Sequence, residues 1–490
     1  MIEINGMNFI AGKKSSKGKN IFQSINPKTF EISKIKFTDA TREEINEALE
    51  KAEEAFKEIQ KERIAVFLKE VSNQIMQLGD QLLDIANWET ALGISRLKNE
   101  RIRTSTQLEK FAEYIKEGSH LDLTSDQDSN IKSMNIPIGP VIVFPASNFP
   151  FAFGVCGGDT ASAWAAGCPV VVKVHPSHPQ TSELFAHAIL KAIEKHNIPN
   201  GFFSMLHGKN PDVSKQLVLH PKVEAIGFTG SFKIGRAIFD LAATREKPIP
   251  VYAEMGSINP IFIVSYKKDT AEEIANSITL GTGQFCTKPG VIFVLEKSKG
   301  IIKEVVEQIK SKKPEILLNK NIKKRLINTV NITKKIENVE VLTGGNEIKN
   351  KNSFENTIFL TDSKTYQKNK NLHHEHFGPV AIFVKCISLE EFIEIANKLE
   401  GQLTGTIYIN KTDIKKVKPM FLELTGKVGR IIINGVPTGV KVCTAMNHGG
   451  PYPATTTPQT TSVGMKAIRR FLRLIAFQNV PNDLLPNELR

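Results

Sequence analysis

Val141-Ile142-Val143-Phe144 and Pro169-Val170-Val171-Val172-Lys173 are short apolar runs with almost no polar interruption, and they decide the fold class of this chain. Further candidates alternate around them, namely helices over 149–166 and 181–196 and strands over 202–206 and 224–228. Continuous apolar strands that alternate with helices are typical of a parallel sheet covered on both faces. We therefore predict an α/β domain from about residue 137.

The flanking sequence has different patterns. Residues 39–118 have helical periodicity, with a capping box between Thr41 and Glu44. Residues 119–136 are polar and alternate weakly, which favours an exposed arm or hairpin. A second α/β unit is expected from about 260 to 430. Strand candidates in this unit and in the tail are 381–384, 406–410 and 474–478.

Size and composition narrow the class of protein. The chain has 490 residues, too many for one core, so two or three sub-domains are expected. With 41% hydrophobic and 23% charged residues it has an ordinary globular composition. The net charge of +13 comes from scattered lysines without interleaved aromatic residues, which argues against nucleic acid and favours attraction to small anions.

Targeting and metal-binding signals are missing from the sequence. The N-terminus has no signal-peptide pattern, and no run of about 18 apolar residues predicts a membrane span. The five cysteines are widely spaced and form no CxxC pair, so no metal site and no disulfide framework is predicted. A reducing cytoplasm fits this pattern best.

Gly283-Gln284-Phe285-Cys286-Thr287 carries the candidate nucleophile. It follows a predicted helix over 269–280, which Asp269 is expected to cap. Gly281 and Gly283 break that helix and leave Cys286 in a loop, where reactive groups tend to lie. A free cysteine needs environmental help to form enough thiolate near neutral pH. Taken alone, a buried structural cysteine is the plainer interpretation.

Two segments have features of a nucleotide-binding surface. Lys173 ends an apolar strand, and ligands bind at the carboxyl ends of parallel strands, where a cation suits a ribose or phosphate. Gly230-Ser231-Phe232-Lys233-Ile234-Gly235 follows another strand and opens a helix whose first N–H groups attract pyrophosphate. The GxGxxG fingerprint is absent, so this is not the usual Rossmann turn. A surface lysine and an ordinary turn are the alternatives.

Glu254 and Asn148 complete a set of reactive groups. Glu254 lies among apolar neighbours, where the pKa of a carboxylate can be raised and the group can act as general base. Asn148 follows the first strand, where its amide can donate to a developing oxyanion together with the backbone N–H of Cys286. A strand-end charge and a turn asparagine are the alternatives. Together the groups supply what two-step aldehyde oxidation requires: thiolate addition, hydride loss and thioester hydrolysis.

Six motifs in order then resemble one family. PASNFP, VVVKVHPSHP, FTGSFKIG, AEMGSINP, GQFCT and EHFGP are similar, in order and approximate spacing, to those of the NAD(P)-dependent aldehyde dehydrogenase superfamily. The resemblance covers nearly the whole chain. It implies an aldehyde dehydrogenase-like α/β fold with two parallel-sheet domains and a small β oligomerisation arm. It implies these roles: Cys286 as nucleophile, Glu254 as general base, Asn148 as oxyanion donor, Lys173 as ribose ligand, Gly230 and Ser231 as pyrophosphate contacts, and Glu375 and Phe377 as holders of the nicotinamide ribose.

One departure from the family pattern concerns the cofactor. Many NAD-using members have a glutamate three residues after the lysine, where its carboxylate binds the ribose 2′-hydroxyl, and Pro176 stands there in this chain. Loss of that carboxylate removes repulsion toward a 2′-phosphate, so the resemblance implies NADP, with NAD possible. Lys209 is a candidate phosphate partner.

A narrower resemblance concerns the substrate. GQFCTKPG, NGVPTGVKVC and HGGPYPATT are similar to 2,5-dioxovalerate (α-ketoglutarate semialdehyde) dehydrogenases and to NADP-dependent long-chain aldehyde dehydrogenases. The first group implies oxidation of 2,5-dioxopentanoate to 2-oxoglutarate; the second implies a fatty or other aliphatic aldehyde. Lys288 is a candidate ligand for the substrate carboxylate, or only a solvated lysine. A CoA-acylating enzyme is less favoured, because such relatives generally lack the base at Glu254. A non-enzymatic binding role would predict damage to the nucleophile or base, and both are intact.

The family fold also implies domain boundaries and assembly. Residues 1–118 and 137–252 would form the cofactor domain, 253–430 the catalytic domain, and 431–490 an active-site loop and a last strand. The arm 119–136 and that last strand would join subunits into a homodimer or homotetramer.

Overall fold

The first of two large sheets contains the segment predicted to be α/β. The computed structural model describes residues 2–490 and orders the strands β11-β10-β7-β8-β9-β1-β2. Strands β7 to β11 are parallel, and only β1 and β2 run antiparallel at one edge. The strand bounds are β1 Asn8–Ile10, β2 Lys13–Ser15, β7 Val141–Phe144, β8 Val170–Lys173, β9 Phe203–Leu206, β10 Ala225–Thr229 and β11 Val251–Glu254.

The uninterrupted apolar character of β7 reflects two separate cores. Val141 and Val143 pack into the core on one face of the sheet, and Ile142 and Phe144 pack into the core on the other. Helices α2 to α6 supply the first core, and α1, α7 and α8 supply the second. The helix bounds are α1 Arg42–Glu58, α2 Ile64–Gln77, α3 Gly79–Thr90, α4 Ile94–Glu117, α5 Gly158–Ala166, α6 Pro179–Lys195, α7 Pro211–Leu219 and α8 Phe232–Ala243. The predicted covered parallel sheet is confirmed.

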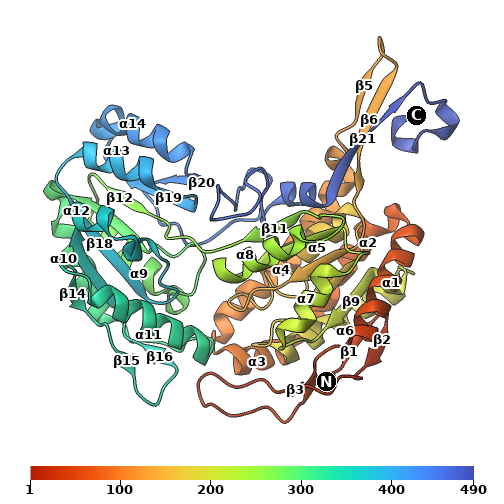
Figure 1. The fold of residues 1–490 in the computed structure, drawn as a ribbon, viewed down its shortest axis with the longest axis horizontal. Helices are drawn as coiled ribbons and strands as arrows, with labels where there is room; N and C mark the ends of the chain where they lie inside the picture. The colour runs from red at the N-terminus through yellow and green to blue at the C-terminus, as the bar shows by residue number, and fades with distance from the viewer. Residues whose placement is uncertain (1) are drawn as a thin grey trace.

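A second sheet forms the other lobe in Figure 1, with the strand order β14-β17-β18-β13-β12-β19-β20. All its neighbours are parallel except β14 with β17. Val291 and Phe293 face one core, and Ile292 and Val294 face the other, as in the first sheet. The bounds are β12 Ile261–Ile263, β13 Val291–Leu295, β14 Glu340–Thr343, β17 Thr357–Asp362, β18 Val380–Cys386, β19 Gln402–Tyr408, β20 Val428–Ile433, α9 Thr270–Thr279, α10 Gly300–Ser311, α11 Lys320–Lys334, α12 Ser363–Lys368, α13 Leu389–Lys398 and α14 Ile414–Thr425.

The predicted arm is a β-hairpin that projects from the body of the molecule (Figure 1). Its strands β5 (Thr124–Asp126) and β6 (Ile131–Pro137) are antiparallel, and the last strand β21 (Leu472–Gln478) pairs with β6 of the same chain. The role of this arm between subunits stays a prediction. Two short ribbons complete the strands: β3 Ile21–Phe22 with β4 Phe37–Thr38, and β15 Glu347–Ile348 with β16 Ser353–Phe354.

Two local predictions were wrong in part. The helix expected over 149–166 begins only at Gly158, because the preceding segment folds into turns: the N–H groups of Phe151 and Ala152 donate to Glu100 Oε1. The helix after Asp269 is present, but the Asp269 side chain makes no capping bond. The capping box at Thr41 is confirmed in full.

Two segments connect the two lobes: the short link from β11 to β12, and the long segment after β20 that returns to the edge of β11. The chain leaves the carboxyl end of β11 at Glu254 and enters the amino end of β12 at Ile261. The carboxyl edge of the first sheet therefore borders the amino edge of the second. Within residues 2–490, no helix combines the length and apolarity needed to cross a membrane.

Candidate active site

The cysteine loop has the irregular backbone that its glycines predict. Gly281, Thr282 and Gly283 all have positive φ, at 55°, 59° and 63°. A Cβ at Gly283 would lie 2.2 Å from the carbonyl oxygen of Gly378, so only glycine fits this approach. Asn259 holds the far side of the loop, since its Nδ2 donates to the carbonyl oxygens of Cys286 and Lys288. These contacts fix Cys286 in a loop before β13.

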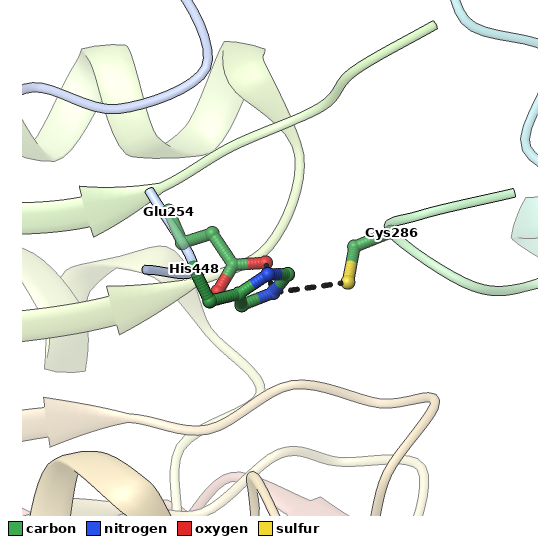
Figure 2. Close-up of side chains that lie close together, drawn as sticks. All are labelled: Glu254, Cys286 and His448. Carbon is green, nitrogen blue, oxygen red and sulfur yellow. Dashed lines mark hydrogen bonds and ion pairs between the residues drawn. The ribbon is translucent and has the colours of Figure 1, made fainter. Parts of the chain in front are cut away.

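Cys286, His448 and Glu254 form one cluster (Figure 2). Cys286 Sγ lies 3.4 Å from His448 Nε2, and the same nitrogen lies 3.0 Å from Glu254 Oε1. Ser462 Oγ donates to the other carboxylate oxygen of Glu254 at 2.7 Å. Glu254 is 3% exposed and His448 1%, so the acid and the imidazole are both shielded from bulk water. The structure thus brings together the predicted nucleophile and the predicted base.

His448 and Ser462 were missed as site residues by the sequence analysis. His448 lies in the HGGPYPATT stretch, which was used only to identify relatives. The loop that carries it runs along the open edge of β11: Met255 N–H donates to Ala454 O, and Ala253 N–H donates to Thr456 Oγ1. This edge contact brings a histidine next to Glu254 although the two are 194 positions apart in the chain. A histidine at the start of the glycine- and threonine-rich stretch 449–464 was the available signal.

The electrostatics of the cluster differ from the prediction for Glu254. Burial acts to raise the pKa of Glu254, but the charge of His448 and the hydrogen bonds from His448 and Ser462 outweigh it, so the pKa lies below its usual range. The expected raised pKa was wrong because apolar sequence neighbours do not reveal these polar partners. Burial and the nearby Glu254 charge raise the pKa of the Cys286 thiol well above its usual value. The resting pair is therefore a thiol and a carboxylate.

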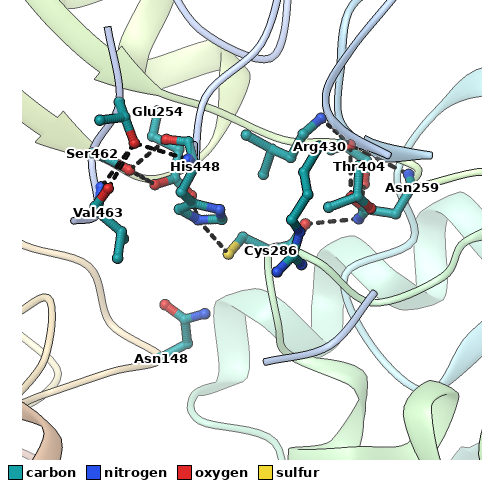
Figure 3. Close-up of polar contacts among 12 residues, drawn as sticks. Asn148, Glu254, Asn259, Cys286, Thr404, Arg430, His448, Ser462 and Val463 are labelled. Carbon is teal, nitrogen blue, oxygen red and sulfur yellow. Dashed lines mark hydrogen bonds and ion pairs between the residues drawn. The ribbon is translucent and has the colours of Figure 1, made fainter. Parts of the chain in front are cut away.

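Asn148 lies below Cys286 in Figure 3, on a different segment of the chain from Glu254 and His448. It is buried, and its Nδ2 donates to the carbonyl oxygen of Gln284, two residues before the nucleophile. Arg96 Nη2 donates to the Asn148 carbonyl oxygen at 2.6 Å and supports this turn. An amide Nδ2 has two N–H groups, so one remains for an oxyanion formed near Cys286.

The predicted phosphate and ribose contacts lie at the carboxyl edge of the first sheet. Ser231 is the N-cap of α8 and makes no side-chain capping bond, so the first N–H groups of this helix lack an acceptor from it. Gly230 N–H donates to Glu254 O, which ties this turn to the end of β11. Lys173 ends β8, where burial lowers its pKa to about 8 despite the opposing charge of Asp39. This surface fits a dinucleotide phosphate.

Glu375 and Phe377, the predicted contacts of the nicotinamide ribose, lie in the loop before β18. A Cβ at Gly256 would lie 2.5 Å from Glu375 Oε2, so this carboxylate packs on the glycine just beyond Glu254. Lys288 is 1% exposed, and its ammonium donates to Val380 O. Burial raises the pKa of Glu375, and the charge of Lys288 opposes that rise. Lys288 is therefore not a solvated lysine, and its candidate role as a substrate ligand stays a prediction.

The region predicted to decide between cofactors contains two lysines and an acid whose carboxylate is already occupied. The loop after β9 brings Gly208 against the Lys173 side chain, since a Cβ at Gly208 would lie 3.1 Å from Lys173 Cε, and Lys209 follows. Asp39, the nearby acid, already accepts the backbone N–H groups of Lys209 and Asn210. Lys209 therefore follows a residue that packs against Lys173, and its side chain is exposed.

Known proteins resemble this chain in sequence and in fold. The model of the aldehyde dehydrogenase family matches residues 13–465. The alpha-ketoglutaric semialdehyde dehydrogenase 2 of Azospirillum brasilense is 39% identical, over 93% of this chain and 90% of that protein. The alpha-ketoglutaric semialdehyde dehydrogenase of Acinetobacter baylyi is 37% identical, over 100% of this chain and 97% of that protein.

Solved structures show the same fold at low sequence identity. The aldehyde dehydrogenase KauB from Pseudomonas aeruginosa has a TM-score of 0.85 at 21% identity, over 97% of both chains. The betaine aldehyde dehydrogenase from Staphylococcus aureus, solved with NAD⁺, has a TM-score of 0.84 at 19% identity, over 99% of this chain and 100% of that chain. With the family match over most of its length, this chain belongs to the aldehyde dehydrogenase family and is an oxidoreductase that acts on aldehydes.

Proposed function

We propose that this enzyme oxidises 2,5-dioxopentanoate (α-ketoglutarate semialdehyde) to 2-oxoglutarate, with a preference for NADP. The observation that carries the chemistry is the Cys286–His448–Glu254 cluster, in which one imidazole nitrogen lies within contact of both the thiol and the carboxylate. The substrate is supported by the two semialdehyde dehydrogenases that resemble nearly the whole chain.

The first step is attack of Cys286 on the aldehyde carbon. With its ring proton on Nδ1, a neutral His448 can take the thiol proton at Nε2, which offsets the raised pKa of this thiol. The Nε2–H that results then donates to Glu254 Oε1. Once protonated, the imidazole faces both the thiolate and Glu254 and stabilises the two negative charges. The free N–H of Asn148 and the backbone N–H of Cys286 would hold the oxyanion of the resulting thiohemiacetal.

The cofactor surface supports the second step. Ser231, Gly230 and Lys173 would hold the phosphates and a ribose, while Glu375 and Phe377 would hold the nicotinamide ribose. When bound, the nicotinamide accepts the hydride that leaves the thiohemiacetal carbon. Lys173 and Lys209 support the preference for NADP, because two cations and no carboxylate at Pro176 suit a 2′-phosphate.

Hydrolysis of the thioester is the last step. Glu254 is ionised and buried, so its carboxylate can take a proton from water that attacks the acyl carbon on Cys286. Ser462 and His448 orient that carboxylate through one hydrogen bond to each oxygen. This arrangement supports hydrolysis of the thioester to a free carboxylic acid rather than transfer of the acyl group to CoA.

A second candidate substrate has its own support. Apolar side chains gather beside the cysteine loop, and an aliphatic aldehyde would contact them; they are Phe149, Phe153, Val440, Val442 and Met446. The chemistry and the catalytic residues would be unchanged. A homodimer or homotetramer in the cytoplasm remains part of the proposal, with the hairpin arm as the expected contact.

Initial rates test this proposal. We would measure formation of the reduced cofactor while crossing NADP and NAD with 2,5-dioxopentanoate and a medium-chain aldehyde. We expect kcat/KM to be highest for the dioxo acid with NADP. A higher kcat/KM for the aliphatic aldehyde would assign the enzyme to that substrate, and faster turnover with NAD would reject the cofactor preference.

A further inference from the structure

Helix α4 presents two arginines to the space around the cysteine loop. Arg96 and Arg103 are seven residues apart, which places them two turns apart on one face. The Arg96 guanidinium stacks over the rings of Phe149 and Phe285, at 4.9 and 4.8 Å from their centroids, and holds the Asn148 carbonyl oxygen. Arg96 is thus used to support the two loops that bear the reacting groups.

Arg103 has no comparable task. Its guanidinium lies 5.3 Å from the ring centroid of Phe153, and its buried Nη1 has no hydrogen-bond partner among residues 2–490. Its charge acts on Cys286 and Glu254 and counters the rise in the pKa of the Cys286 thiol. The Phe153 ring also lies 6.3 Å from the His448 ring, so Arg103 and the reacting cluster border the same aromatic side chain. Arg103 has at least one donor unused at this place.

Arg96 and Arg101 also have buried donors without a partner, but each makes one hydrogen bond to a carbonyl oxygen. Other arginines near the active site or in the core are paired through their guanidinium groups. Arg470 pairs with Asp159 at 2.7 Å, and Arg430, which lies beside Cys286 in Figure 3, donates to the carbonyl oxygens of Pro437 and Gly439. A buried N–H group without an acceptor costs free energy, so such a group in a functional site calls for an absent partner.

The nearest acid does not supply that partner. Glu100, one turn earlier on α4, acts on Arg103 through its charge, but one of its oxygens accepts the N–H groups of Phe151 and Ala152. Its Oε2 is itself buried without a hydrogen-bond partner in the described chain. Glu100 therefore holds the turn after Asn148 and leaves the guanidinium of Arg103 available.

We propose that Arg103 binds the carboxylate end of the substrate and selects acidic semialdehydes over neutral aldehydes. This inference rests on the proposed function and adds the residue that recognises the substrate. A guanidinium presents parallel N–H donors that match the two oxygens of a carboxylate or of a 2-oxo acid. The apolar wall around Phe153 keeps water away and strengthens this charge pairing. The aldehyde at the other end of the molecule would then lie at Cys286.

The test compares Arg103→Gln with a matched control on the same helix, Arg101→Gln. The Arg101 guanidinium donates to Gly79 O, away from the site. We expect Arg103→Gln to lower kcat/KM for 2,5-dioxopentanoate by about 30-fold or more, mainly through KM, because it removes one member of a buried charge pair. With pentanal, Arg101→Gln should stay within about 3-fold of the unmodified enzyme. Arg103→Gln should lose far less with pentanal than with the dioxo acid, and that smaller loss reflects the missing charge beside the Cys286 thiol.

Product inhibition supplies a second readout. We expect 2-oxoglutarate to inhibit pentanal oxidation competitively in the unmodified enzyme and in Arg101→Gln, and to lose about 30-fold in potency in Arg103→Gln. Equal losses of kcat/KM with both substrates, or unchanged inhibition, would overturn the role of Arg103. If the unmodified enzyme oxidises pentanal but neither uses the dioxo acid nor responds to 2-oxoglutarate, the proposed function fails as well.

Discussion

The two sheets have the same architecture but contribute to the active site from opposite ends. In the first sheet, Lys173, Gly230 and Glu254 lie at or just after the carboxyl ends of β8, β10 and β11. In the second sheet, Cys286 and Glu375 lie in loops before the amino ends of β13 and β18. The rule that ligands bind at the carboxyl ends of parallel strands therefore describes only the first sheet.

This difference has a physical cause. The short connection from Glu254 to Ile261 places the carboxyl edge of one sheet against the amino edge of the other. The first edge offers free helix N-termini and a lysine, which suit phosphate groups. The second edge offers a glycine-rich loop, which can hold a thiol close to a ligand. The amino edge of the second sheet thus bears the nucleophile, and the carboxyl edge of the first sheet bears the expected cofactor contacts.

Removal of the nucleophile should give the largest effect. We expect Cys286→Ala to abolish aldehyde oxidation, because within residues 2–490 the thiol in hydrogen-bond contact with His448 is that of Cys286. NADP binding, measured by fluorescence titration, should stay within about 2-fold, since the phosphate contacts belong to the other sheet. Measurable turnover in this variant would remove Cys286 from the mechanism. Loss of NADP binding would show that cofactor binding and the nucleophile are not confined to separate sheets.

Glu254→Gln should separate the two half-reactions. We expect a burst of reduced cofactor of about one equivalent per active site, followed by a steady state lower by roughly 10²- to 10⁴-fold, because the amide cannot take a proton from water. Rapid-mixing absorbance would resolve the two phases. Because the pKa of Glu254 lies below its usual range, the unmodified enzyme should keep this base ionised at neutral pH and lose hydrolysis only in acid. An unchanged steady state across pH would contradict this role.

His448→Gln should affect both half-reactions to a smaller extent. We expect the burst rate and the steady-state rate to fall by about 100-fold, because the thiol loses the group that accepts its proton. Raising the pH should recover part of the burst rate, since the pKa of Cys286 is high and thiolate then forms without help. Ser462→Ala is the matched control: it removes a hydrogen bond to Glu254 and leaves the thiol contact in place. A burst that does not respond to pH would show that His448 only packs against the site.

Lys173 tests the cofactor edge alone. Its pKa of about 8 means that the ammonium is charged below pH 8 and neutral above it. NADP should therefore bind most tightly below pH 8, and its Kd should rise as the pH passes through that value. Lys173→Met should raise Kd by about 10-fold at pH 7 and remove this step, with little effect on kcat at saturation. A Kd that is independent of pH in the unmodified enzyme would exclude Lys173 as a phosphate or ribose ligand.

Several features could be predicted from the sequence because they depend on neighbours along the chain. Alternating apolar strands and helices predicted the first sheet, since each strand must bury both faces. The same logic predicted the Thr41 capping box and the break at Gly281 and Gly283. The early start predicted for the helix that ends at Ala166 was wrong, because a remote carboxylate, Glu100, takes the N–H groups of the preceding turn.

The sequence by itself thus determined the succession of strands and helices, the cysteine loop and the family resemblance. Only the tertiary structure decided which groups act on one another. His448 and Ser462 reach Glu254 because a distant loop follows the edge of β11, and their hydrogen bonds reverse the expected shift in its pKa. Lys288 is buried, while Arg103 keeps an unpaired donor near the thiol within the described part of the chain. Burial and charge pairing depend on three-dimensional neighbours, and no local pattern encodes them.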